Sequence, residues 1–297
     1  MMNFTQKPDV YRPSIASSAM LVNLSISVWT ARKLDKKATN DVISDNGADR
    51  RAGNFNKNLL AGCQELDALQ KFASSARAAS IGMTVPWSDS GLRLLSTQRF
   101  FKYNETMEGL KAEFNVLLDK LGSVYDWQVM QTQSKLGNLF NAAEYPTWDQ
   151  LQGKFGFSLN YIPVPEAGSI QLDMEQRAQD LIIQQYEEFY GAQIAKMYAD
   201  VQERLQTELG RFVNQLRVEE GARGRIYDST IRHVERLAEM LEEVNFQDDV
   251  NIALFARQVK SVVAGMTRED LVNNEGFRME TKATLEEALK NLPSLDM

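Results

Sequence analysis

The chain has 297 residues, of which 43% are hydrophobic and 25% are charged, so it can bury a sizeable core. It contains one cysteine and one histidine, which excludes an intrachain disulfide and a Cys/His zinc site built by a single chain. No run reaches the roughly 18 apolar residues of a membrane span, so we expect no membrane association. A single cysteine is typical of a protein of the reducing cytoplasm, where we expect this protein to reside.

Apolar and polar residues alternate along residues 21–28, with apolar positions at Val22, Leu24, Ile26 and Val28. Strict alternation predicts a half-buried strand, because successive side chains point to opposite faces of a sheet. The polar interruptions also argue against a secretory signal, which needs an unbroken hydrophobic centre. We expect this strand to pair with residues 155–161 or 92–97.

Helical spacing follows over residues 57–80, where the apolar face consists of Leu59, Cys63, Leu66, Leu69, Phe72 and Ala76. We expect Cys63 to be a buried, inert thiol, because no basic neighbour is in view to lower its pKa. Residues 103–142 show a second helical pattern. Its seam is typical of a coiled coil and consists of Met107, Leu110, Phe114, Leu117, Leu121 and Val124.

A second alternating segment spans residues 155–163 and ends at prolines, which cannot donate to a strand ladder. From about Gln171 to Glu220 the spacing predicts one very long helix, followed by another helix that ends near Val244. Further helices are predicted over 248–292, one of them starting at Thr267.

Together these elements predict a mostly α-helical α+β fold with long antiparallel, coiled-coil-like helical arms and a small sheet at their base. The sheet is assigned to residues 14–34, 84–97 and 155–163, the arms to 103–142 and 171–244, and the C-terminal helices to 248–292. We expect residues 1–297 to form a single elongated domain.

Residue types offer little for catalysis. A histidine-based nucleophile pair would have to use His233, which lies beside the apolar stripe of its helix and is typical of a surface or half-buried histidine. The segment Gly221–Arg225 could hold an anion through Arg223, Arg225 and its backbone N–H groups, or could simply be a charged helix break. We therefore predict no enzyme activity, no metal and no cofactor.

Basic residues outnumber acidic ones in residues 1–100, whereas the rest of the chain is acidic. In and just after the basic part, aromatic and cationic side chains are interleaved at Trp29, Arg32, Lys33, Arg99, Phe100 and Lys102. This is the composition of a stacking platform for single-stranded nucleic acid, although such aromatics also build ordinary cores. One functional hypothesis is therefore a single-stranded nucleic-acid binder.

Three segments, LVNLSISVWTARKL (21–34), EYPTWDQLQGKFGFSLNYIPVP (144–165) and VVAGMTREDLVNNEGFRMETKATLEEAL (262–289), resemble a domain-of-unknown-function family of bacteriophages and bacteria. Genes of that family tend to lie beside those of a MoxR-type AAA+ ATPase and a protein with a von Willebrand factor A domain. The resemblance implies a non-catalytic component that works with such an ATPase in the host cytoplasm, and it carries over no catalytic residues. The other hypothesis is thus an interaction or adaptor subunit for that ATPase, with homo-oligomerisation left open.

Overall fold

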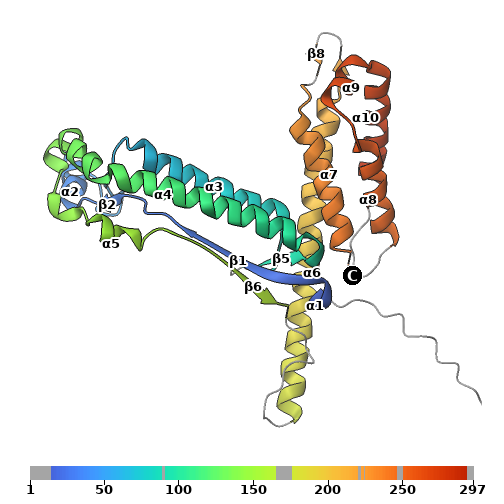
Figure 1. The fold of residues 1–297 in the computed structure, drawn as a ribbon, viewed down its shortest axis with the longest axis horizontal. Coiled ribbons are helices and arrows are strands. Elements are labelled where there is room, and N and C mark those ends of the chain that lie inside the picture. The colour runs from blue at the N-terminus through green and yellow to red at the C-terminus, as the bar shows by residue number, and fades with distance from the viewer. Residues whose placement is uncertain are drawn as a thin grey trace, which may run out of the picture. The chain divides into compact units, whose positions relative to one another are not determined.

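The computed structural model describes residues 15–88, 91–164, 176–219, 222–223, 225–245 and 250–292. Helices dominate this part of the chain and a small antiparallel sheet accompanies them (Figure 1), which confirms the mostly α-helical α+β class. The chain divides into two compact units. Unit 1 holds the described residues of Met1–Asn23, Met83–Phe100 and Tyr161–Met297, and unit 2 consists of Leu24–Gly82 and Phe101–Asn160. That residues 1–297 act as a single domain stays a prediction.

Four strands form the sheet in the order β4–β5–β1–β6. They span Val85–Pro86 (β4), Arg93–Ser96 (β5), Ala19–Ser27 (β1) and Gly156–Pro163 (β6). β1 pairs with β5 in antiparallel register, with Ala19 opposite Ser96 and Val22 opposite Arg93, and β6 is its other neighbour. β1 therefore pairs with both of the segments that the sequence analysis gave as alternative partners. The division between the two units falls within β1 and within β6.

From Val22 to Ser27, burial along β1 follows the predicted alternation, whereas nearer the start of the strand Ala19 and Leu21, on the other face, are buried in the core of unit 1. The side chains of Val22 and Ile26 are buried and that of Leu24 is half-buried, whereas the polar positions Asn23, Ser25 and Ser27 are exposed. Leu24 and Ile26 pack into the core of unit 2, together with residues of α3 and α4. From Leu24 onward one face of this strand is therefore apolar because it supports the core of unit 2, as the sequence indicated.

Unit 2 contains nearly all of α3 and α4 together with several shorter elements. These are β2 (Arg32–Leu34), α2 (Lys36–Asp45), β3 (Asn56–Asn58), α3 (Gln64–Met83), α4 (Phe100–Leu136), the 3-10 helices η2 (Gly137–Leu139) and η3 (Ala142–Glu144), and α5 (Trp148–Gln152). The prediction that the first long helix begins at residue 57 is wrong. Residues 56–58 pair with β2 instead, and Gly62 with φ +74° turns the chain before α3 begins.

Helices α3 and α4 run antiparallel, and side chains join their ends. Near one end the hydroxyls of Ser80 and Tyr103 are 2.8 Å apart, and near the other the amide of Gln128 donates to Glu65 at 3.2 Å. Between these contacts the predicted seam of α4 is confirmed, with Met107, Phe114 and Leu121 buried and Leu110, Leu117 and Val124 half-buried. This packing fixes the rotation of α4 about its own axis.

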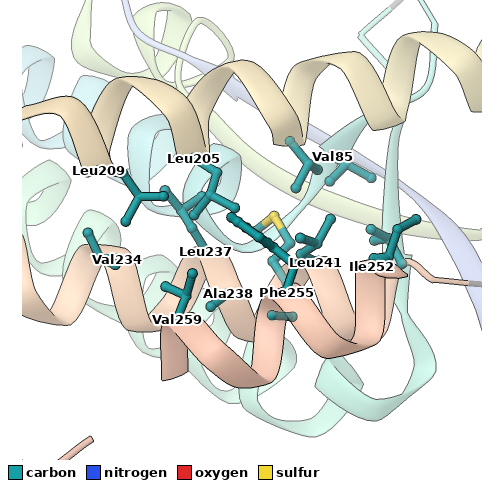
Figure 2. Close-up of a cluster of buried hydrophobic side chains, with 14 of the residues drawn as sticks. Val85, Leu205, Leu209, Val234, Leu237, Ala238, Leu241, Ile252, Phe255 and Val259 are labelled. Carbon is teal, nitrogen blue, oxygen red and sulfur yellow. The ribbon is translucent and has the colours of Figure 1, made fainter. Parts of the chain in front are cut away.

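Unit 1 is built mainly from helices α6 (Gln176–Gln215), α7 (Asp228–Glu243), α8 (Val250–Val263), α9 (Arg268–Asn273) and α10 (Glu275–Lys290). It also holds α1 (Ile15–Ser18), the 3-10 helix η1 (Thr97–Arg99) and the paired strands β7 (Val218–Glu219) and β8 (Ala222–Arg223). Helices α6, α7 and α8 enclose a common apolar cluster, which Figure 2 shows with Leu205, Leu237 and Phe255 at its centre. The predicted stripe of the long helix is buried from Met197 to Leu216.

The long helix α6 ends earlier than its apolar spacing predicted. It stops at Gln215, where the buried guanidinium of Arg278 donates to the carbonyls of Gln215 at 2.9 Å, Leu216 at 3.1 Å and Arg217 at 3.0 Å. These are carbonyls that no further helical turn satisfies, and a cation is favoured at this negative end of a helix. The chain then turns into β7, so the expected extension to residue 220 is wrong.

We expect Ile26→Asp to destabilise the protein by at least about 3 kcal/mol, because it places an unpaired charge in the core of unit 2. Ser25→Asp is the matched control, because Ser25 is exposed on the other face of the same strand. Thermal melts followed by circular dichroism measure both changes. Equal losses for the two variants would contradict the assigned faces of β1.

Candidate functional site

The residues that could have supported catalysis do not gather into a site. His233 is exposed on α7, and Cys63 is buried next to the start of α3. Burial raises the pKa of the Cys63 thiol, and the nearby Glu65 carboxylate acts in the same direction. Within the described ranges, no group of three or more His, Cys, Asp or Glu side chains could hold a metal ion. None of the helices described is long and apolar enough to cross a membrane.

The most enclosed charged group of unit 2 is Lys57, on β3. Its ammonium lies 3.0 Å from the carboxylate of Asp35 and 2.8 Å from that of Glu144, and it donates to the carbonyl of Leu139 at 2.8 Å. Burial works against its charge, but hydrogen bonds to the two carboxylates outweigh this and raise the pKa of Lys57. Two hydrogen bonds and an ion pair with Glu144 engage the ammonium, so Lys57 ties β3 to the start of α2 and to the segment after α4 rather than offering a reactive amine.

The six residues predicted as a nucleic-acid platform come from both units. Trp29 packs edge-on against Tyr125 in unit 2, and Phe100 packs against Tyr161 in unit 1. Arg99 is buried and ion-paired with Glu239 and Glu243 of α7, so it holds η1 on that helix instead of facing a phosphate. The remaining cations, Arg32, Lys33 and Lys102, are exposed.

Of the two residues predicted to contact an anion, Arg225 can be placed, whereas the side chain of Arg223 lies outside the described part. Arg225 lines an open hollow of about 610 Å³ beside α6, where Arg211 and Asn214 also contribute. Its guanidinium stacks over the ring of Tyr227 at 5.7 Å, and Arg211 is paired with Glu208 at 2.8 Å. Arg211 therefore already has an ion-pair partner, and that Arg223 and Arg225 bind an anion stays a prediction.

A second hollow, of about 310 Å³, lies between α2 and the loop that follows it. Its walls are mostly apolar, and the half-exposed Val42 and Phe55 border it. The hydroxyl of Thr39 within it is already used, since it donates to the carbonyl of Asp35 and accepts from the backbone N–H of Phe55. The hollow thus offers apolar contact but few polar groups to orient a ligand.

The outward face of α4 is a third candidate surface. An exposed row runs along this face, which we call the α4 stripe, and it consists of Ala112, Val116, Ser123, Trp127 and Met130. At 100° per residue these five positions fall within an arc of about 60°, opposite the buried seam. Trp127 is 55% exposed, Met130 65% and Val116 52%.

The α4 stripe is a feature that sequence reasoning missed. In the sequence the buried seam of α4 is a continuous apolar pattern, whereas the stripe has small and polar residues between its large apolar ones. A signal was present in the spacing, since Val116 and Trp127 are 11 residues apart, as are Ala112 and Ser123. Eleven residues make three helical turns, so such pairs share a face.

Comparisons with known proteins add no information on the site. No family model matches the chain, and searches of curated proteins and of solved structures return no match.

We expect Lys57→Met to cost roughly 3 kcal/mol of unfolding free energy, because it leaves two carboxylates facing each other without their shared cation. Lys33→Met is the control, since the half-exposed ammonium of Lys33 lies 3.8 Å from Glu144 and should contribute less than about 1 kcal/mol. Urea unfolding of both variants measures the difference. Similar losses for the two lysines would contradict a structural role specific to Lys57.

We expect the Cys63 thiol to react with a disulfide reagent at least about a hundredfold more slowly in the native protein than in urea, because it is buried and its pKa is raised. The absorbance of the released thiolate at pH 8 measures the rate. A native rate close to that of the unfolded chain would show that Cys63 is accessible and reactive.

Proposed function

We propose that this protein is a non-catalytic interaction subunit that binds a protein partner through the α4 stripe. The partner that we propose is a component of a MoxR-type AAA+ ATPase system, either the ATPase itself or the protein with a von Willebrand factor A domain. The identity of the partner follows from the sequence resemblance, and the binding surface follows from the geometry of α4.

The observation that carries the proposal is the exposure of Trp127 between Met130 and Val116 on one helix face. Single exposed apolar residues are common on soluble proteins, but a large aromatic flanked by further apolar side chains marks an interaction surface. Tryptophan is among the residues that contribute most to binding when an interface covers them, and methionine is also enriched in interfaces. An exposed apolar row along a helix suits recognition by another helix or a groove.

The alternative, a single-stranded nucleic-acid binder, has less support from the structure. Its central cation, Arg99, is committed to Glu239 and Glu243, and its two aromatic rings pack against Tyr125 and Tyr161. A stacking platform needs aromatic faces that bases can reach beside cations that are free to meet phosphates. We therefore favour the protein-binding function.

Trp127→Ala should weaken binding to the partner about 30-fold, which corresponds to the roughly 2 kcal/mol of an interface hot spot. It should leave the thermal stability nearly unchanged, because the side chain is 55% exposed. The experiment measures the affinity of the purified full chain for a purified MoxR-type ATPase and for a von Willebrand factor A protein of the same genome.

Ile81→Ala is the control for this experiment, because Ile81 is a comparably exposed apolar residue of unit 2 that lies on α3. It should leave the affinity unchanged. Binding to neither protein, or equal binding by the Trp127→Ala variant and the unaltered chain, would contradict the proposed function.

A further inference from the structure

One border of the α4 stripe is acidic. Glu108, Asp119 and Asp126 are all exposed, and they follow each other at offsets of 11 and 7 residues. Eighteen residues make five full helical turns, so Glu108 and Asp126 lie in line, about 27 Å apart along the axis. Asp119 deviates from that line by only about 20°. A row of carboxylates therefore accompanies the apolar residues over the length of the stripe.

The other border has no such uniform charge. Glu113 and Lys120 lie there, both exposed, and their charges are opposite. Glu105 adds a further carboxylate near the middle of the outward face. Exposed carboxylates therefore outnumber exposed ammonium groups along the α4 stripe, and most of them lie on the side of Asp119 and Asp126.

We infer that the α4 stripe binds an amphipathic helix of the partner. The apolar side of that helix covers Trp127, and one of its flanks carries lysine or arginine. This inference rests on the proposed function and adds the chemistry of the partner segment. Apolar contact supplies most of the affinity, and charge complementarity sets the orientation and the choice of partner. From Val116 to Met130 the stripe spans four turns, so a helix of about 14 to 18 residues covers it.

The acidic border disfavours the other classes of occupant. Carboxylates repel the phosphates of nucleic acids and of anionic lipids, so neither is attracted to this face. A second copy of the chain, packed antiparallel about a two-fold axis, would bring the row of Asp119 and Asp126 against its own copy. An extended peptide would find no strand edge on a helix. A basic-flanked helix is the occupant that satisfies both the apolar and the charged residues.

The test uses two synthetic 18-residue helical peptides with the same leucine face, one with arginine and the other with glutamate along one flank. Their affinities for the purified full chain are measured by isothermal titration at low and at high salt. We expect the arginine peptide to bind at least about tenfold more tightly at low salt, and high salt to reduce this preference.

The double variant Asp119→Lys, Asp126→Lys should invert the preference, so that the glutamate peptide binds more tightly. Asp41→Lys, the same charge change at an exposed position of α2, should leave the preference intact. Equal affinities of the two peptides for the unaltered chain, or an unchanged preference in the double variant, would overturn the basic-flank inference.

Trp127→Ala separates this failure from a failure of the proposed function. If both peptides bind equally and Trp127→Ala weakens both, the stripe is a binding surface but its charge selects nothing. If Trp127→Ala weakens neither peptide, and does not weaken binding of the ATPase system, the surface itself is wrong. If sedimentation shows a dimer of the full chain that Trp127→Ala dissociates, a second copy occupies the stripe and the inference is overturned.

Discussion

The packing of α3 against α4 is the constraint on which unit 2 depends. Two side-chain contacts, Ser80 with Tyr103 and Glu65 with Gln128, join the helices near their two ends, and large buried side chains fill the space between them. On a neighbouring side of α4, Gly122 meets the ring of Trp148 so closely that a Cβ atom there would lie 2.7 Å from it. Because these contacts occupy the inner sides of α4, its remaining face is left outward, and that face carries Trp127.

Two buried cations join elements that are distant in the sequence. Lys57 joins β3 to acidic groups from the start of α2 and from the segment after α4, and Arg278 of α10 covers the last carbonyls of α6. Both side chains reach partners that are distant in sequence. Their contribution comes from hydrogen bonds and, for Lys57, ion pairs, since a buried charge is costly unless it is paired or hydrogen-bonded.

Local patterns predicted much of this fold. The alternation around Ile26 predicted β1 and its faces, apolar spacing predicted the long helices, and Thr267 with Asp270 forms the capping box that starts α9. The predictions failed where long-range contacts decide the outcome. Nothing near Lys57 in the sequence shows that its strand pairs with β2, and nothing near Gln215 shows that Arg278 covers the end of the helix there.

The candidate site was harder to predict for a related reason. Arg99 and Phe100 look like a binding motif in sequence, yet each has a partner within unit 1. The exposure of Trp127 does not follow from the sequence, because apolar residues occur on two sides of α4 and only the packing decides which side is covered. A periodic pattern predicts that a face exists, whereas exposure depends on what the rest of the chain places against it.

Site-specific photocrosslinking tests most directly whether the outward face of α4 is where a protein partner binds. A photoreactive residue replaces Ser123, which is exposed in the α4 stripe, and in a parallel sample it replaces Ser75, which is exposed on α3. The account predicts a crosslink from position 123 to the ATPase or to the von Willebrand factor A protein, and none from position 75. Equal crosslinking from the two positions, or crosslinking from position 75 alone, would contradict it.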